Sequence, residues 1–308
     1  MPNERIPASF NVGLSFAVWA GLCGLLYRAS HSRSLLELGC AALAFSFLAN
    51  TCFSLLHESV HGVFHPNARV NDLFGAVSAA FFPTGFHFQR ACHLGHHARN
   101  RTAFETFDYI YPGDSRALKT LEWYGILAPS YWLTVILGWI LFGLAPGMLR
   151  LGARFASRSA AAEHTAGPAY ARGLEAVSPV RARLELAFTV ALQATLWLAL
   201  GLSLRGWLAC YLAFAVNWSA LQYADHAFSP LDVRRGAWDL RVPRLWRWIF
   251  LNYHLHRAHH MNPRVPWLHL PRHVDETVPR PSFFAQYLAM WRGPRRAPGP
   301  PAREVVVE

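Results

Sequence analysis

The chain has 308 residues, of which 53% are hydrophobic and only 15% charged, and it contains 12 tryptophans. This composition is unusual for a soluble protein, and apolar runs long enough to cross a bilayer indicate an integral membrane protein. The net charge of +11 comes from arginines that flank the apolar runs, which excludes a basic nucleic-acid-binding face and fits positive-inside topology. The five cysteines form no CxxC motif, so the sequence encodes neither an iron–sulfur site nor a disulfide framework.

We predict four transmembrane helices, arranged as two hairpins, at residues 10–27, 35–56, 186–204 and 206–223. The first run is too long for the core of a signal peptide and no cleavage site follows it, so we expect an uncleaved span. Its hairpin brings the chain out of the membrane at His57. The second hairpin turns at Arg205 and Gly206 and brings the chain out at Asp225 and His226. Both hairpins are therefore predicted to end on one side of the membrane.

Two other apolar segments are predicted not to cross. Residues 73–86 form a short run with a proline and a glycine near its end, which favours a re-entrant or interfacial helix. Residues 124–145 are long enough to cross, but the arginine-rich residues 148–183 that follow favour the side on which the hairpins end. We therefore expect residues 124–145 to enter and return, with bends that Pro129, Gly143 and Pro146 allow.

The predicted fold class is all-α: a polytopic membrane protein with four transmembrane helices in two hairpins, re-entrant or interfacial helices and a helical cap. Residues 1–292 are expected to form a single domain. Residues 293–308 are rich in proline and arginine, and we expect them to be a disordered tail. The distribution of arginine predicts that the cap lies on the cytoplasmic side of an inner or plasma membrane.

Three histidine clusters lie outside the predicted spans. His57 and His61 form an HxxxH pair, and two HxxHH triplets follow at His93, His96 and His97 and at His256, His259 and His260. On a helix, positions three and four residues on flank the direction of the first residue, so the imidazoles of each triplet are predicted to converge on one point. Imidazole binds iron, zinc, copper and nickel, and two triplets plus a pair exceed what one metal needs.

The first cluster also has the pattern H-E-x-x-H, from His57 through Glu58 to His61. In an intramembrane zinc metalloprotease the two histidines would bind one zinc and Glu58 would be the general base. That alternative leaves both HxxHH triplets without a role, and metal analysis separates one bound zinc from a site that holds two metal ions. A non-enzymatic metal carrier or channel would place its ligands inside the spans, whereas these lie at their ends.

The order HxxxH, HxxHH, HxxHH, with apolar spans placed as above, resembles the membrane fatty acid desaturase superfamily over residues 57–271. The third triplet carries the most specific part of the resemblance, because Asn252-Tyr253-His254 precede it and Pro263, Pro266-Trp267 and Leu270-Pro271 follow it. Gln222 and His226 stand at the spacing of a further ligand pair that members of this superfamily carry between the second and third clusters.

The resemblance implies a non-haem diiron centre that uses dioxygen as co-substrate. Its implied ligands are nine histidines: His57, His61, His93, His96, His97, His226, His256, His259 and His260. Gln222 would contribute through a bound water. Neutral imidazoles need acceptors that fix their tautomers, and the acidic candidates for this role are Glu58, Glu105, Asp108 and Asp225.

The implied activity is that of a fatty acyl desaturase, which removes two hydrogens from an acyl chain. Hydroxylase, carotenoid-ketolase-like and alkene-forming activities stay open, because the outcome depends on how the chain is placed against the metals. The sequence has no haem-binding domain, cysteine cluster or GxGxxG fingerprint. Electrons would therefore come from a ferredoxin, rubredoxin or cytochrome-type donor, and the substrate would be an acyl lipid, acyl-CoA or acyl carrier protein.

Overall fold

The computed structural model describes residues 4–145, 147–148 and 173–304. The long helices are α1 (Ala8–Ser30), α2 (Leu35–Val60), α9 (Pro179–Leu200) and α10 (Leu204–Gln222). The shorter helices are α3 (Ala68–Phe81), α4 (Phe86–Arg99), α5 (Arg116–Leu127), α6 (Ser130–Leu144), α11 (Arg244–Ile249), α12 (His256–Met261), α13 (Phe283–Met290) and the 3-10 helix η2 (Leu270–His273). In the described part of the chain, the strands β1 (Tyr109–Ile110) and β2 (Arg295–Arg296) form a single small parallel sheet. The predicted all-α fold class is confirmed.

Three of the described helices, α1, α2 and α9, are long and apolar enough to cross a membrane. A fourth candidate is the pair α5 and α6, which are bent by 92° relative to one another. The predicted span at residues 206–223 corresponds to α10, which has 19 residues, is not among these candidates and packs along α2 and α1. The chain is therefore a polytopic membrane protein with three or four candidate spans.

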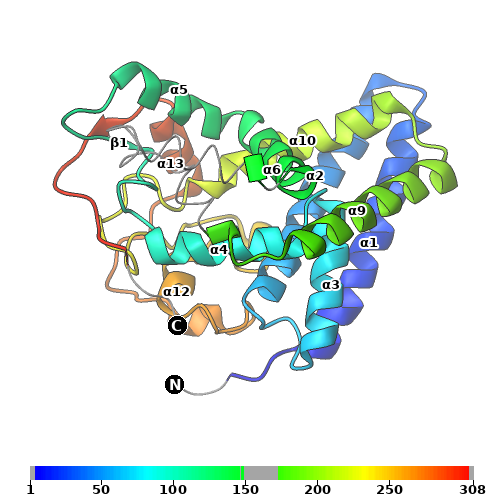
Figure 1. Ribbon diagram of the computed structural model, residues 1–308, viewed down its shortest axis with the longest axis horizontal. Helices are drawn as coiled ribbons and strands as arrows, with labels where there is room; N and C mark the ends of the chain where they lie inside the picture. Colours follow the sequence, from blue (N-terminus) through cyan, green and yellow to red (C-terminus); the bar gives the residue numbers. More distant parts are fainter. Residues whose placement is uncertain (1–3, 146, 149–172, 305–308) are drawn as a thin grey trace.

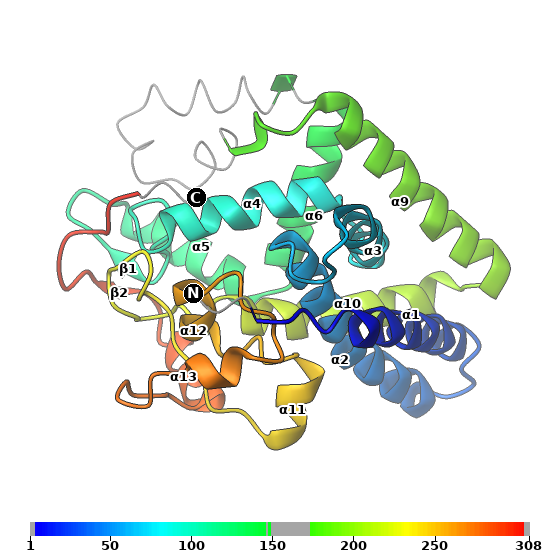
Figure 2. The same ribbon diagram turned by 90° about the horizontal axis from the view of Figure 1, so that it is seen from below.

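The first hairpin has its turn where the sequence predicts it. Helix α1 ends at Ser30, and the hydroxyl of Ser34 accepts a hydrogen bond from the backbone N–H of Glu37 at the start of α2. A serine at this position satisfies one of the free N–H groups at the beginning of a helix. The two helices then run side by side in both views (Figures 1 and 2).

The second hairpin differs from the prediction in its turn and in its packing. Helix α9 ends at Gly201, which has φ of +56°, and Ser203 caps α10, so the turn precedes Arg205 and Gly206. Gly206 lies inside α10, where an added Cβ would be only 2.5 Å from the Cα of Ser30. The glycine is needed for close packing of α10 against the end of α1. Helices α9 and α10 then diverge, because α9 packs on α3 and α6 while α10 packs on α2 (Figure 2).

The expected bend near Pro129 is confirmed. Helix α5 ends at Leu127, and Ala128 has an extended backbone with ψ of 165°. The residue before a proline is forced out of the helical region, so α6 starts anew in a different direction. Helix α3, with 14 residues and a length of ~21 Å, is too short to cross. The arginines of the following segment at residues 150, 154, 158 and 172 lie outside the described residues.

Composition predicts disorder for residues 293–308. The structure places the described part of this segment against β1, Arg101 and Phe228. Strand β2 pairs with β1, and the N–H of Ala302 donates to the carbonyl of Arg101. The guanidinium of Arg295 lies 3.6 Å from the centre of the Phe228 ring. These contacts give the arginines of a polar segment specific partners, which composition alone does not reveal.

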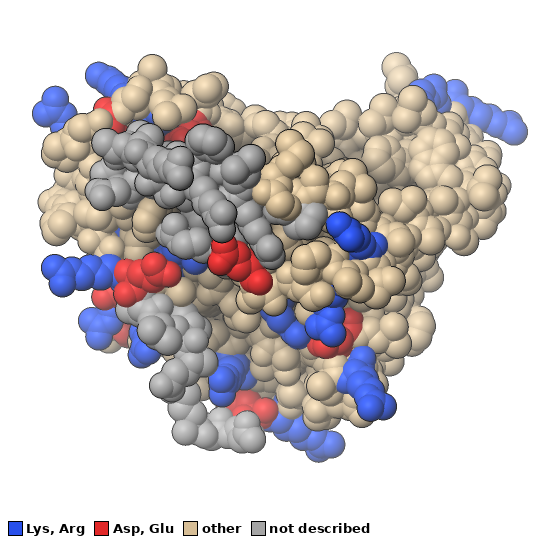
Figure 3. Space-filling model, viewed as in Figure 1, with Lys and Arg blue, Asp and Glu red and all other residues tan. Residues whose placement is uncertain are grey.

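Charged side chains are unevenly distributed over the surface. In Figure 3 they gather over the lower and left-hand part of the molecule, whereas the right-hand part formed by α1, α9 and α10 is almost bare apart from its tip. At that tip Arg28 pairs with Glu37, and Arg205 donates to the carbonyl of Ser32. An apolar middle between polar ends is the pattern of helices that cross a hydrocarbon core.

Candidate metal centre

The nine predicted histidines gather at one place, where the end of α2 meets α4, α12 and the turn that follows α10 (Figure 1). His57 is in the last turn of α2 and His61 is its C-cap residue, so their four-residue spacing places both rings on one side of the helix. The triplets occupy the C-terminal half of α4 and the whole of α12. His226 stands on the turn after α10.

Eight of these side chains form two groups of four, and within each group one ligand atom per residue lies within 4.8 Å of all the others. The first group is His57, His61, His93 and His259, and the second is His96, His226, His256 and His260. Each group therefore draws on three segments that are far apart in the sequence.

The triplets do not converge on one point as predicted, because each is divided between the two groups. Helix α4 gives His93 to the first group and His96 to the second, whereas α12 gives His259 to the first and both His256 and His260 to the second. Successive helical residues point about 100° apart. Neighbouring histidines such as His96 and His97 can therefore serve different sites.

The ninth histidine, His97, lies against the first group. Its Nε2 is 3.1 Å from Nε2 of His93 and 3.0 Å from Nε2 of His259, and its ring stacks on His260 with centroids 4.2 Å apart. His97 thus faces two members of the first group with its nitrogen and one member of the second with the face of its ring.

The contacts between these nitrogens match the requirements of bound metal ions. Nε2 of His61, His93, His97 and His259 form a series of contacts at 2.9, 3.1 and 3.0 Å. A ring nitrogen offers one hydrogen bond, so the two inner nitrogens cannot both satisfy two neighbours. With a metal–nitrogen bond of ~2.1 Å, ligands at right angles to one another would lie ~3.0 Å apart. The residues present therefore fit a metal better than a hydrogen-bonded cluster.

The environment keeps the imidazoles neutral, which is the form that binds metal. Burial, followed by the charge of neighbouring groups, holds the pKa well below the usual 6.5 for His61, His93, His97, His226, His256, His259 and His260. Nε2 of His57 is buried and has no hydrogen-bond partner among the described residues. Such a nitrogen is costly to bury unless a ligand engages it.

A comparison with known families agrees with this geometry. The family model described as fatty acid desaturase matches residues 32–293. The chain belongs to the fatty acid desaturase family. A search of curated proteins gives no match. Membership indicates an oxidoreductase with lipid substrates and an electron-donor partner, and the clustered histidines fit the diiron oxidases of this superfamily.

Family membership also bears on the protease alternative. A single catalytic zinc needs one protein ligand besides the two histidines of H-E-x-x-H, whereas His57 and His61 belong to a group of four histidines with a second group of four beside it. The carboxylate of Glu58 accepts a hydrogen bond from the backbone N–H of Trp267 at 3.0 Å. These contacts and the membership in the desaturase family do not support an intramembrane metalloprotease.

The second group has acceptors that orient its rings. Nδ1 of His226 donates to the carbonyl of Gly236 at 2.9 Å, and Nδ1 of His96 lies 3.2 Å from Glu105 Oε2. Both partners are acceptors, so each Nδ1 carries the proton and each Nε2 presents its lone pair to the centre. Nδ1 of His256 lies 3.5 Å from Asp225 Oδ2. Burial raises the pKa of Asp225 well above the usual 3.8, and no hydrogen bond reaches its carboxyl oxygens from the described residues.

The other candidates for orienting the ligands lie elsewhere. Asp108 accepts two hydrogen bonds from Arg101, at 2.7 and 2.9 Å, so it belongs to a buried ion pair and not to a histidine. Glu58 is held by Trp267, as described above. Gln222 accepts a hydrogen bond from the Tyr253 hydroxyl at 3.2 Å, so in the described contacts it reaches the histidines only through this tyrosine.

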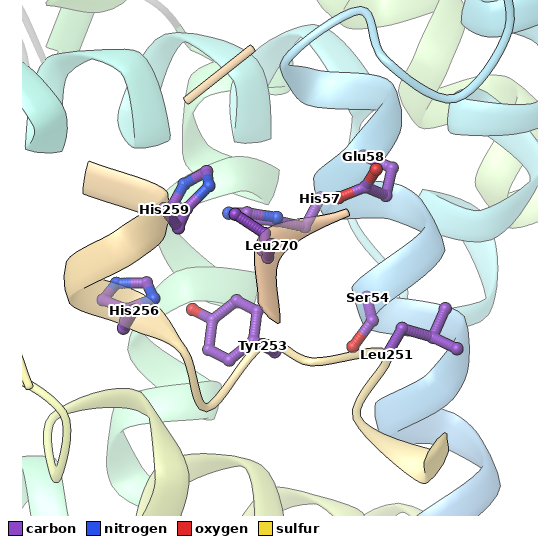
Figure 4. Close-up of a pocket in the computed structure, with 8 residues that line it drawn as sticks. All are labelled: Ser54, His57, Glu58, Leu251, Tyr253, His256, His259 and Leu270. Carbon is purple, nitrogen blue, oxygen red and sulfur yellow. The ribbon is translucent and has the colours of Figure 1, made fainter. Parts of the chain in front are cut away.

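Tyr253 is a site residue to which the sequence assigned no role. Its ring centroid is 5.0 Å from those of both His57 and His256. With these histidines it lines a pocket beside the metal centre, whose other walls are Ser54, Glu58, Leu251, His259 and Leu270 (Figure 4). The signal for it was its position immediately before the third triplet, within Asn252-Tyr253-His254.

Proposed function

We propose that this protein is a membrane-bound, dioxygen-dependent diiron oxidase that desaturates an acyl chain. In this reaction a saturated carbon–carbon pair loses two hydrogens, while dioxygen, two electrons and two protons complete the formation of two waters. The observation that carries the proposal is the pair of four-histidine groups in a chain that belongs to the fatty acid desaturase family. Imidazole suits iron as well as zinc, copper and nickel, and the choice of iron rests on the family.

The proposed ligand sets are unequal. The first iron would be held by His57, His61, His93, His97 and His259, since His97 contacts two members of that group. The second iron would be held by the remaining four, His96, His226, His256 and His260. Bound iron would supply the capacity to reduce dioxygen and to break an unactivated C–H bond.

The protein's own contribution is orientation and exclusion of water. The carbonyl of Gly236 and the carboxylate of Glu105 hold the Nδ1 side of His226 and His96, so the lone pairs on Nε2 point inward, and the carboxyl group of Asp225 lies 3.5 Å from Nδ1 of His256. Tyr253 packs against two of the ligands and is tied to Gln222, which keeps the ring at the edge of the centre. Full burial of most ligands shields reactive species from solvent.

The partners and orientation follow from the same proposal. Electrons would come from a ferredoxin, rubredoxin or cytochrome-type donor that docks on the arginine-rich side, which we place in the cytoplasm of an inner or plasma membrane. The acyl group would be carried by a lipid, coenzyme A or acyl carrier protein. Turnover with a reduced donor should fall as ionic strength rises, because screening weakens docking between charged surfaces. Turnover that does not depend on salt would contradict this docking.

The test of the reaction is expression of the protein together with a reductase system, followed by mass spectrometry of total lipids. Desaturation gives acyl products that are lighter by two hydrogens. Hydroxylation gives products that are heavier by one oxygen, and this result would replace desaturation by the alternative outcome of the superfamily. The matched control is His259→Ala, which removes a ligand of the first group. A wild-type lipid profile identical to that of this variant would overturn the proposed function.

A further inference from the structure

His226 differs from the other members of the second group in what supports it. His96 stands on α4, and His256 and His260 stand on α12, whereas His226 belongs to the turn after α10. A turn does not fix a ring as a helix does, so additional contacts must hold the segment that we call the His226 loop, residues 223–236. The contacts that do so come from the chain immediately after the second histidine triplet.

Asn100 holds the far end of the His226 loop. Its side chain is buried, and Nδ2 donates to the carbonyl of Val233 at 3.0 Å and to that of Gly236 at 3.1 Å. The carbonyl of Gly236 also accepts the hydrogen bond from Nδ1 of His226. Asn100 therefore positions the acceptor that orients His226.

Arg101 holds the beginning and the middle of the same loop. Its guanidinium donates to the hydroxyl of Tyr223 at 3.2 Å and to the carbonyl of Ser229 at 3.1 Å, while both of its Nη atoms engage Asp108. Its aliphatic part covers Gly236, where an added Cβ would lie 2.2 Å from the Arg101 Cγ. The glycine is thus required by the arginine that packs on it.

Asp108 completes the arrangement from the other side. Its Oδ2 accepts a hydrogen bond from the backbone N–H of Phe228, and its Oδ1 lies 2.9 Å from the Tyr223 hydroxyl. Arg101 and Asp108 are both fully buried, so the two charges compensate one another in the interior. This single ion pair is therefore hydrogen-bonded to the side chain of Tyr223 before His226 and to the backbone of Phe228 and Ser229 after it.

The backbone at these positions adopts a conformation that costs free energy. Arg101 follows the C-cap of α4 with φ of +60°, a left-handed conformation for which glycine is the usual residue, and Phe228 has φ of +59°. An arginine at such a position needs a compensating role for its side chain. The four hydrogen bonds of the guanidinium provide that compensation.

We propose that Asn100, Arg101 and Asp108 form a clamp that positions His226 for the second metal, an inference that rests on the proposed function. The clamp couples two neighbouring ligands of one metal, since the chain that carries His96 continues directly into the residues that hold His226. The three clamp residues are positioning residues, because they reach the centre only through the His226 loop.

The test uses the full-length protein in detergent, stripped of metal and titrated anaerobically with Fe²⁺. The main variant replaces Arg101 and Asp108 together by leucine, because removal of both charges avoids leaving one of them buried alone. We expect this variant to bind one iron per chain where the wild type binds two. Asn100→Ala, a smaller change, should retain both irons but weaken the second ~10- to 100-fold, as loss of a residue that orients a ligand does.

The matched control is Gln193→Leu, which replaces a half-buried amide of α9 that contacts Ala80, Tyr211 and Trp207 and none of the nine histidines. This variant should bind two irons with wild-type affinity. Two irons with wild-type affinity in both clamp variants would overturn the clamp and leave the proposed function standing. A wild-type protein that binds fewer than two irons would instead overturn the proposed function, and the clamp with it.

Discussion

The two histidine groups are built from the same two helices in opposite proportions. Helix α4 directs His93 and His97 to the first group and His96 to the second, whereas α12 directs His259 to the first and His256 with His260 to the second. The two groups differ in the histidines that other segments add to those of α4 and α12. The first group gains a pair from the end of α2, and the second gains only His226 from a loop. With His97 counted beside the first group, the second group has one histidine fewer and depends more on its surroundings.

The comparison predicts its largest effect for two adjacent residues. His96→Ala leaves the second group with three ligands and no substitute, whereas His97→Ala leaves the first group with four. Iron content of purified protein should fall from about two to about one per chain in the first variant, with loss of turnover, and should stay near two in the second. Equal loss of iron in both variants would show that the groups are not separate sites.

A smaller effect is expected from Asp225→Asn, which keeps the size of the side chain and replaces the buried carboxyl group 3.5 Å from Nδ1 of His256 by an amide. Affinity for the second iron should fall ~10- to 100-fold, because an acceptor that orients a ligand is weakened. The first group should be unaffected. Iron titration of the metal-free protein measures the affinity of both groups. Unchanged iron content and turnover would show that Asp225 does not orient His256.

Both groups should respond together to acid in the metal-free protein. The folded pKa of the clustered histidines lies well below 6.5, so the unfolded chain binds more protons as pH falls through that value. The contribution of these histidines to stability should therefore be constant at higher pH and decline below about 6.5, by ~1.4 kcal/mol per pH unit for each such histidine. Thermal unfolding in detergent between neutral and acidic pH tests this. A melting temperature that does not depend on pH would contradict the burial of neutral rings.

The smallest effect on the metal centre is expected from a change in the contact between α10 and the end of α1. Gly206→Ala forces a methyl group against the backbone of Ser30 and should destabilise the protein by ~1–3 kcal/mol. Gly39→Ala is the matched control, because nothing lies within 4 Å of its added Cβ, and it should be neutral or slightly stabilising. Melting temperatures should differ between the two variants while both bind two irons. Loss of one iron on Gly206→Ala alone would link the hairpin tip to one histidine group.

The sequence predicts well what depends on local pattern. Apolar length locates α1, α2 and α9, and the restriction before Pro129 locates the bend between α5 and α6. The same reasoning misplaces the second hairpin turn, because Gly206 interrupts hydropathy for a packing reason that appears only when α1 lies beside it. A glycine in a sequence does not reveal whether it serves a turn or a close contact.

Prediction of the site from the sequence has the same limit, because long-range contacts are not visible in local pattern. Histidine spacing identifies the ligands, yet their division into two groups depends on where α4 and α12 face one another, which spacing does not determine. The acidic residues look alike in the sequence, but Asp225 lies beside His256 whereas Asp108 forms an ion pair with Arg101. The role of an acidic residue depends on contacts with residues far away in the sequence, and local sequence pattern does not predict these contacts.

The contact of residues 295–302 with Phe228 and Arg101 has a consequence for biosynthesis. Residues 295–302 leave the ribosome after every span and all nine histidines, yet Arg295 covers Phe228 and Ala302 bonds to Arg101. The covering of the His226 loop is thus a late event, which follows membrane insertion. Until it occurs, the His226 loop, which carries one histidine of the second group, lacks the cover that Arg295 and Ala302 provide.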